Sequence, residues 1–327
     1  MERTEKILAG NVRVVSTLIR NLEDRVPKAK AAIRNIYPHT GKAHVIGFTG
    51  SPGAGKSTLI DTMIAVYRKQ GKTVGALLVD PTSPFTGGAV LGDRVRMQRH
   101  AGDPDVFVRS LASRGALGGL SKAVGNAIHI LDAMGKDIII VETIGAGQQG
   151  VDIINHAHTV IVVQIPGMGD EIQTLKAGIL EIADIFMINK ADRDGGGKLY
   201  QELMHMLNMV ENYTGGWRPP IIRAENINDR DAFTKSVEEL TDAVDAHYQN
   251  LVSKNILEEC LLRHVMIELD ETLEAAILEP IITELTKSGE LDRFVDKILH
   301  RELDPNTVAE EIAERYLKGY DREQISQ

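Results

Sequence analysis

A glycine-rich run ahead of an apolar, helix-forming segment has the residue types and spacing that bind phosphate. Its glycines allow the backbone to curl so that successive N–H groups point at phosphate oxygens, and the helix adds its positive N-terminal end. We expect Lys56 to reach the β- and γ-phosphates and the Ser57 hydroxyl to bind Mg²⁺. The sequence therefore predicts a nucleoside triphosphate site. Its predicted residues are Gly50, Ser51, Pro52, Gly53, Ala54, Gly55, Lys56, Ser57 and Thr58.

A second pattern indicates which nucleotide binds. Asn189, Lys190 and Asp192 form an NKxD sequence directly after a buried-strand pattern at residues 182–188. The Asp192 carboxylate can accept hydrogen bonds from N1–H and the exocyclic amine of guanine, whereas adenine would leave it unpaired. A site built to hydrogen-bond one base rejects another by orders of magnitude. The sequence therefore predicts GTP and GDP as ligands rather than ATP.

Acidic residues at strand ends supply the expected metal ligands. Asp80 and Glu142 each end an apolar strand pattern, and Asp93 lies in a glycine-bracketed loop between them. Mg²⁺ bound to phosphates needs few protein ligands, typically a hydroxyl and one or two carboxylates. Ser57 with some of Asp80, Asp93 and Glu142 meets that need. We take Lys56, Asp93 and Glu142 as the candidate catalytic residues.

The elements that must position these residues alternate between strands and helices from residue 43 onward. Expected strands cover residues 45–49, 74–79, 106–109, 138–142, 160–164 and 185–189. The alternation predicts an α/β fold of the P-loop NTPase class, with a mainly parallel sheet covered by helices and the ligand at the strands' C-terminal ends. The expected domains are an N-terminal helical extension at 1–42, a GTPase domain at 43–232 and a C-terminal helical region at 233–327.

The C-terminal region carries an apolar stripe at a four-residue spacing, which predicts a long helix ending at Pro280. A further helix is expected to open at Asp304-Pro305. The stripe is longer than one domain needs and predicts a homodimer, although packing against the chain's own core would also explain part of it. The stripe consists of Leu257, Leu261, Val265, Leu269, Leu273 and Ile277.

Composition narrows the classes of partner. The 327 residues are 43% hydrophobic and 25% charged, as in soluble globular proteins, and the net charge of −9 argues against a nucleic-acid partner. No apolar N-terminal or membrane-length segment is found, which predicts a cytoplasmic protein without membrane contact. The single cysteine, Cys260, excludes a disulfide framework or a multi-cysteine zinc site, and His156 and His158 are expected at the surface.

Longer runs spread over nearly the whole chain are also distinctive. They are GFTGSPGAGKST at 47–58, DPTSPFTGG at 80–88, LGDRVRM at 91–97, SRGALGGL at 113–120, VETIG at 141–145, PGMGDEIQ at 166–173 and NKAD at 189–192. With these runs the chain resembles the MeaB/ArgK/MMAA family, GTPase chaperones of adenosylcobalamin-dependent methylmalonyl-CoA mutase and its relatives. The resemblance implies a homodimeric GTPase with slow intrinsic hydrolysis that its mutase partner stimulates. Such a protein would gate adenosylcobalamin loading and protect or reactivate the mutase.

The resemblance also implies switch segments that sense the nucleotide. They are the loop holding Asp93 and Arg94, the segment after Glu142, and residues 166–176, where Asp170 and Lys176 are the implied partner contacts.

The chain departs from the family pattern at two places. Gln149 and Gly150 stand where the family has serine and glutamate, and only Ala224 matches the Thr/Ser-Ala pair expected beside the base. Two other functions remain open at this point. One is a P-loop kinase, against which the NKxD pattern argues. The other is an adaptor that binds GTP only as a structural ligand.

Overall fold

The structure, a computed structural model, describes residues 2–24, 26–81, 97–100, 102–113, 119–143, 155–167, 182–224 and 226–316. The chain divides into two compact units, Met1–Glu268 and Leu269–Gln327. The strands are β1 (His44–Gly50), β2 (Val74–Pro81), β3 (Val106–Ser113), β4 (Ile138–Glu142), β5 (Thr159–Gln164), β6 (Ile185–Ile188) and β7 (Ile221–Arg223).

The helices of the first unit are α1 (Glu2–Leu8), α2 (Val12–Glu23), α3 (Pro27–Ile36), α4 (Lys56–Lys69), α6 (Gly119–Ala133), α10 (Gly196–Asn208) and α11 (Arg230–Ser253), with short 3₁₀ turns at Tyr37–His39, Gln98–His100 and Thr214–Gly216. Helix α12 (Ile256–Ser288) begins in the first unit and ends in the second, which also holds α13 (Glu290–Leu299) and α14 (Pro305–Tyr316). None of the described helices combines the length and apolar character needed to cross a membrane.

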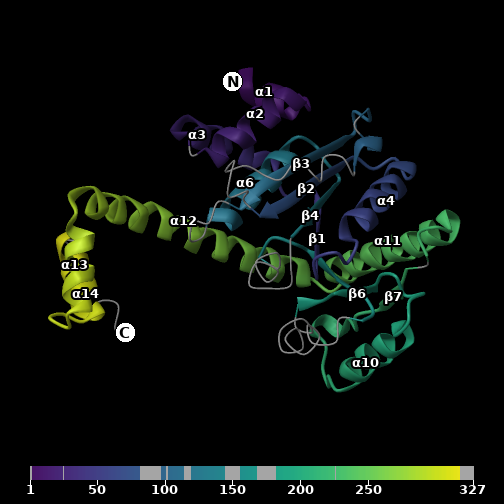
Figure 1. Ribbon diagram of the computed structural model, residues 1–327. Helices are drawn as coiled ribbons and strands as arrows, with labels where there is room; N and C mark the ends of the chain where they lie inside the picture. The colour runs from purple at the N-terminus through teal and green to yellow at the C-terminus, as the bar shows by residue number, and fades with distance from the viewer. Residues whose placement is uncertain are drawn as a thin grey trace. The chain divides into compact units, whose positions relative to one another are not determined.

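One parallel sheet organises the first unit, with the strand order β3-β2-β4-β1-β5-β6-β7 in the described residues (Figure 1). Strand β1 lies in its interior between β4 and β5, and every residue of β1, β4, β5 and β6 is buried. Burial on both faces explains why these strands read as unbroken apolar runs. The predicted α/β fold is confirmed.

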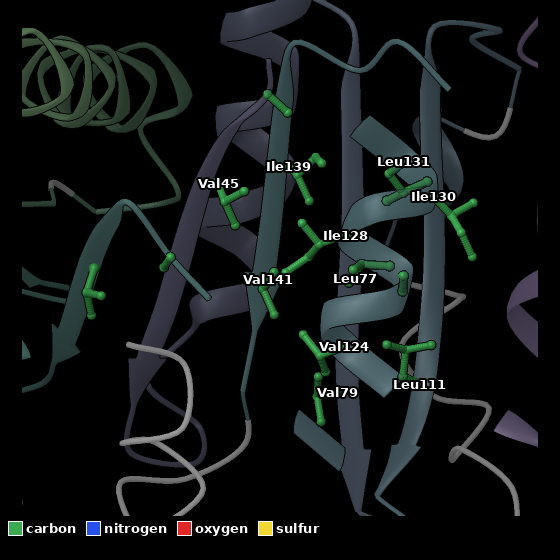
Figure 2. Close-up of a cluster of buried hydrophobic side chains, with 14 of the residues drawn as sticks. Val45, Leu77, Val79, Leu111, Val124, Ile128, Ile130, Leu131, Ile139 and Val141 are labelled. Carbon is green, nitrogen blue, oxygen red and sulfur yellow. The ribbon is translucent and has the colours of Figure 1, made fainter. Parts of the chain in front are cut away.

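Helices cover both faces of this sheet. On one face, α6 lies over β2, β3 and β4, and Figure 2 shows Val124, Ile128 and Leu131 of α6 reaching the side chains of these strands. Apolar residues of α1 to α3 and of α10 join the same cluster. On the other face, α4 and α11 pack through residues such as Ile60 and Val237.

Two features differ from the sequence-based expectation. Strand β7 adds an edge strand beyond the six expected ones, paired in parallel with β6. Helix α12 does not end at Pro280 but continues to Ser288 with the proline inside. A proline removes one helical hydrogen bond, and here the turns beyond it gain from burial, since Leu285 is fully buried against the neighbouring helices of the second unit.

The second unit has a small core of its own. Leu285, Phe294 and Val308, one from each of α12, α13 and α14, form its centre. Asp304 caps the start of α14 as expected, because its Oδ1 accepts from the backbone N–H groups of Asn306 and Thr307.

Candidate functional site

The predicted phosphate-binding loop lies between the end of β1 and the start of α4. Gly50 has φ 137°, and a Cβ there would lie 2.1 Å from the carbonyl oxygen of Val163 on the neighbouring strand. Gly55 has φ 86°, and its Cβ would lie 2.3 Å from Nδ2 of Asn189. A side chain at Gly50 would collide with the backbone of β5, and one at Gly55 would displace Asn189 and strain a backbone with positive φ, so the geometry favours glycine at both positions.

Lys56 is the first residue of α4 and is 5% exposed. Its Nζ donates to the carbonyl oxygens of Gly50 (2.7 Å) and Ser51 (3.2 Å), which directs the ammonium over the loop. Burial lowers the pKa of Lys56, while the nearby carboxylate of Glu142 acts in the opposite direction. A phosphate bound in this loop would stabilise the buried ammonium group of Lys56, because the two charges are opposite.

A hydroxyl and a carboxylate meet beside this lysine. Ser57 Oγ donates to Oε1 of Glu142 over 3.1 Å, and both residues are buried. Glu142 is brought here because β4 pairs in parallel with β1, with Glu142 opposite Phe48. Two hard oxygen donors of this kind suit Mg²⁺. The residues present therefore fit the predicted metal ion.

The other predicted metal ligands are only partly placed. Asp80 lies near the end of β2, opposite Ala112 of β3, and its side chain lies outside the described part of the structure. Asp93, Asp170 and Lys176 lie outside the described residues altogether. Among the described residues, no cluster of three or more His, Cys, Asp or Glu side chains is placed to hold a metal ion by itself.

The NKxD loop follows β6 and is tied to the phosphate-binding loop. Asn189 is buried, and its Nδ2 donates to the carbonyl oxygen of Ala54 (2.7 Å) while its Oδ1 accepts from the backbone N–H of Lys190. Lys190 Nζ donates to the carbonyl oxygen of Gly53 (2.9 Å). The two predicted nucleotide-binding loops therefore form one hydrogen-bonded unit.

The loop after β7 lies against Asp192. Asn226 Nδ2 donates to Asp192 Oδ2 over 3.0 Å, a contact that the sequence analysis missed. Ala224 is fully buried and its backbone N–H donates to the carbonyl oxygen of Ile188, so among the described residues of this loop the contact with Asp192 comes from Asn226. The sequence did hold a signal: Asn226, Asn228 and Asp229 form a turn-like cluster just before a helix.

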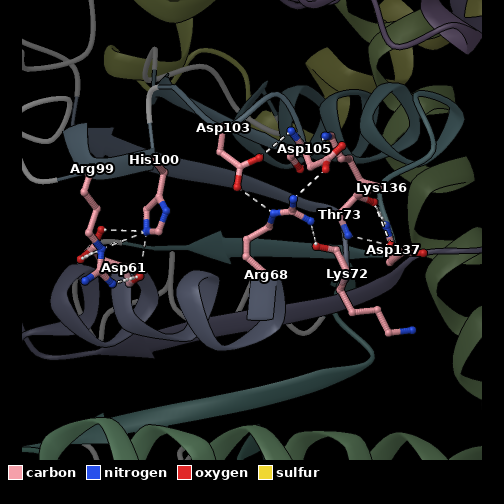
Figure 3. A network of polar contacts seen from close by, with 10 residues as sticks. All are labelled: Asp61, Arg68, Lys72, Thr73, Arg99, His100, Asp103, Asp105, Lys136 and Asp137. Atoms are coloured by element: carbon pink, nitrogen blue, oxygen red, sulfur yellow. Dashed lines mark hydrogen bonds and ion pairs between the residues drawn. The ribbon is translucent and has the colours of Figure 1, made fainter. Parts of the chain in front are cut away.

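An ion-pair cluster holds residues 97–100 against α4. Figure 3 shows Asp61 of α4 between Arg99 and His100. Arg99 Nε lies 2.8 Å from Asp61 Oδ2, and His100 Nε2 lies 2.9 Å from the Asp61 carbonyl oxygen. The chain between β2 and this turn contains Asp93, one of the predicted switch residues. The turn at residues 97–100, which follows this segment, is thus attached to α4, the helix that begins with Lys56.

A second polar cluster in Figure 3 lies at the opposite end of α4. Arg68 donates to Asp103 (2.8 Å) and Asp105 (2.6 Å), and Lys136 donates to the carbonyl oxygen of Asp105. These contacts join α4 to the amino-terminal ends of β3 and β4. Their role is to hold the elements together, since they lie away from the phosphate-binding loop.

Histidines gather at the amino-terminal ends of β1 and β5, opposite to the nucleotide site. His44 Nε2 and His247 Nδ1 each lie 2.9 Å from Oγ1 of Thr159. His158 Nδ1 accepts from a backbone N–H of β1, and its ring stacks on that of His264. His156 and His158 were expected at the surface. The structure half-buries both, because the start of β5 is covered by α11 and α12.

Comparisons with known proteins agree with this geometry. The sequence profile described as "Methylmalonyl Co-A mutase-associated GTPase MeaB" matches residues 13–284. A putative GTPase of Pyrococcus horikoshii is 45% identical, over 96% of this chain and 97% of that protein. The GTPase ArgK of Escherichia coli is 28% identical, over 96% of this chain and 95% of its own length.

A solved structure described as a LAO/AO transport system kinase superposes with a TM-score of 0.72 at 21% identity, covering 96% of each chain. This likeness shows the fold. The family is shown by the sequence profile and by the Pyrococcus relative.

Proposed function

The chain belongs to the family of methylmalonyl-CoA mutase-associated GTPases, and from that membership we propose that it is a chaperone of a cobalamin-dependent acyl-CoA mutase. It is a P-loop GTPase, a hydrolase that converts GTP to GDP and phosphate. In the proposed role, GTP binding and hydrolysis gate the loading of adenosylcobalamin onto the mutase and protect or reactivate that enzyme.

One observation carries the assignment of the site: the phosphate-binding loop and the NKxD loop are joined through Asn189 and Lys190. In this arrangement Lys56 binds the β- and γ-phosphates and Asp192 accepts from N1–H and the exocyclic amine of guanine. Ser57 and Glu142 are the residues that would hold Mg²⁺. When bound, Mg²⁺ neutralises the charge that develops on the phosphate oxygens.

Homodimerisation through α12 is part of the proposal. Leu261, Val265, Leu269, Leu273 and Ile277 recur every four residues and are 40–48% exposed. Apolar side chains exposed over this length of one helix would be buried by a second copy of the chain, because water is then excluded from both. The loops around Asp93, Gly147 and Asp170 would remain free for the mutase.

The test is phosphate release from GTP in Mg²⁺, with and without purified methylmalonyl-CoA mutase and adenosylcobalamin. We expect slow hydrolysis by the protein alone, because GTPases commonly need a partner to order their switch loops. The mutase should raise the rate, and Lys56→Ala should abolish it in both conditions. A rate that no cobalamin-dependent mutase changes would overturn the chaperone role and leave the GTPase activity standing.

Two further readouts separate other activities. Transfer of the γ-phosphate to a second molecule instead of water would indicate a kinase. GTP binding without any hydrolysis in the presence of mutase would indicate an adaptor.

A further inference from the structure

We infer that Asn226 is a positioning residue for guanine selection: its side-chain amide orients the Asp192 carboxylate toward the edge of the base. The inference rests on the proposed role of Asp192 in reading guanine. It adds a residue that the sequence pattern does not mark, since the base-side loop of this chain departs from the Thr/Ser-Ala pair expected there.

The sheet brings the two residues together. Asp192 follows β6 and Asn226 follows β7, and these strands pair in parallel with Ile188 opposite Arg223. Parallel neighbours end at the same edge, so their loops leave the sheet side by side. The result is a hydrogen bond of 3.0 Å from Asn226 Nδ2 to Asp192 Oδ2 across 34 residues of sequence.

The orientation of the Asn226 amide is determined by its own loop. Its Oδ1 accepts from the backbone N–H of Asn228 (3.0 Å), which is an Asx turn. The Asn226 carbonyl oxygen accepts from the N–H of Asp229, and Asp229 in turn caps α11 through the N–H of Ala232. Because the amide oxygen is already used by the turn, the amide nitrogen is the end that faces Asp192.

This contact matters because Asp192 is exposed. An exposed carboxylate samples several rotamers, and ordering it costs free energy at the moment a ligand binds. Holding it beforehand removes part of that cost. One bond from Asn226 uses one of the roughly four acceptor positions of a carboxylate, which leaves positions for N1–H and the exocyclic amine of guanine. An amide is also uncharged, so it orients Asp192 without neutralising it.

The experiment compares the affinities of the full-length protein for GDP and IDP by calorimetry in Mg²⁺. Hypoxanthine lacks the exocyclic amine but keeps N1–H, so the ratio of the two affinities isolates the contact of Asp192 with the amine. We expect Asn226→Ala to lower the GDP/IDP ratio about three- to tenfold, the size of one hydrogen bond, and to lower IDP affinity less than GDP affinity, because IDP makes only the N1–H contact with Asp192. Asn228→Ala is the matched control, since its side chain makes no hydrogen bond among the described residues, and it should keep the ratio.

Asn226→Asp provides a second variant that preserves the turn. Its Oδ1 can still accept from residue 228, but the donor is replaced by a carboxylate that repels Asp192. The GDP/IDP ratio should fall at least as far as in Asn226→Ala. Both variants should unfold at temperatures close to that of the unmodified protein, because the side-chain hydrogen bonds that they remove are exposed.

A double-mutant cycle with Asp192→Ala decides between positioning and a general effect on the loop. In the Asp192→Ala background, Asn226→Ala should no longer change the ratio. An unchanged ratio in Asn226→Ala, or a change that persists without Asp192, would overturn the inference. An unchanged ratio in Asp192→Ala itself would overturn the proposed role of Asp192 instead.

Discussion

At the scale of single residues, the site depends on polar groups that the sheet brings close from distant parts of the sequence. Ser57 and Glu142 are 85 residues apart and lie 3.1 Å apart at the ends of neighbouring elements. A hydroxyl and a carboxylate at this distance can share one ion. Lys56 lies beside them, buried and with a lowered pKa, so a polyanionic ligand would offset the cost of its burial.

The metal assignment predicts the response of turnover to Mg²⁺. Ser57→Ala and Glu142→Ala should each raise the Mg²⁺ concentration needed for half-maximal GTP hydrolysis by about tenfold or more, because each removes an oxygen ligand. Ser253→Ala is a matched control on α11, where the hydroxyl only donates to the carbonyl oxygen of Asn250. Unchanged Mg²⁺ dependence in both site variants would refute the assignment.

At the scale of elements, close backbone approaches determine where the loops lie. Gly195 ends the NKxD loop with φ 91°, and α10 begins at Gly196. A Cβ on Gly196 would lie 2.1 Å from the carbonyl oxygen of Ala191, whereas one on Gly197 would meet nothing within 4 Å. The start of α10 is thus pressed against the loop that carries Asp192.

Two neighbouring glycine substitutions should therefore have opposite effects. Gly196→Ala should destabilise the protein by about 1–3 kcal/mol through overpacking and weaken GDP binding, because Ala191 and Asp192 must shift. Gly197→Ala should stabilise it by about 0.5–1 kcal/mol, the usual gain for alanine over glycine within a helix. Chemical denaturation and GDP calorimetry of the two variants check this. Equal stabilities of the two variants would contradict this prediction and show that the loop holding Ala191 moves aside with no loss of free energy.

At the scale of the whole molecule, the apolar stripe of α12 leads to a prediction about assembly. Leu261→Glu together with Leu269→Glu should convert a dimer to monomers or to insoluble protein, because four new charges would be buried at the interface. Met209→Glu is the control, a charge at an exposed apolar position outside α12. Light scattering at micromolar concentration measures the mass. A monomeric unmodified protein would refute the dimer and mean that these side chains only pack within the chain itself.

The histidine cluster predicts how stability depends on pH. Burial lowers the pKa of His158 and His247 to about 4, and that of His44 well below its ordinary value of 6.5, with neighbouring histidines adding to the shift at His44 and His158. Between pH 6.5 and about 4 the unfolded chain therefore binds more protons at these sites, and stability falls as the pH falls. Asp184 acts in the opposite direction, since removal from water raises its pKa to about 7.

The three histidines together bind more protons on unfolding than Asp184 releases, so the free energy of unfolding should decrease from pH 6.5 to pH 4.5. Denaturant titrations at several pH values measure the slope. His158→Asn, whose amide oxygen can accept the same backbone N–H, should reduce that slope by at most one proton, about 1.4 kcal/mol per pH unit. A slope that His158→Asn leaves intact would show that this ring does not titrate between those limits.

Contiguous patterns in the sequence determined the parts of the protein whose chemistry is local. The glycine-rich run, the NKxD loop and the six apolar strands depend on backbone freedom and on residues next to each other in the chain, so each can be recognised without knowing the fold. Strand β7 was missed because three residues after two prolines are too short to form a pattern. The continuation of α12 past Pro280 was missed because the penalty of a proline is local, whereas the burial of Leu285 that offsets it is not.

Only the tertiary structure decided which distant groups meet. The contacts of Asn226 with Asp192, Asn189 with Ala54 and Ser57 with Glu142 depend on the order and register of parallel strands, which no short window of sequence contains. The same holds for His158, whose burial comes from helices that follow much later in the chain. Residue types in the sequence determined what chemistry was possible. The register of the sheet decided which of those side chains lie together.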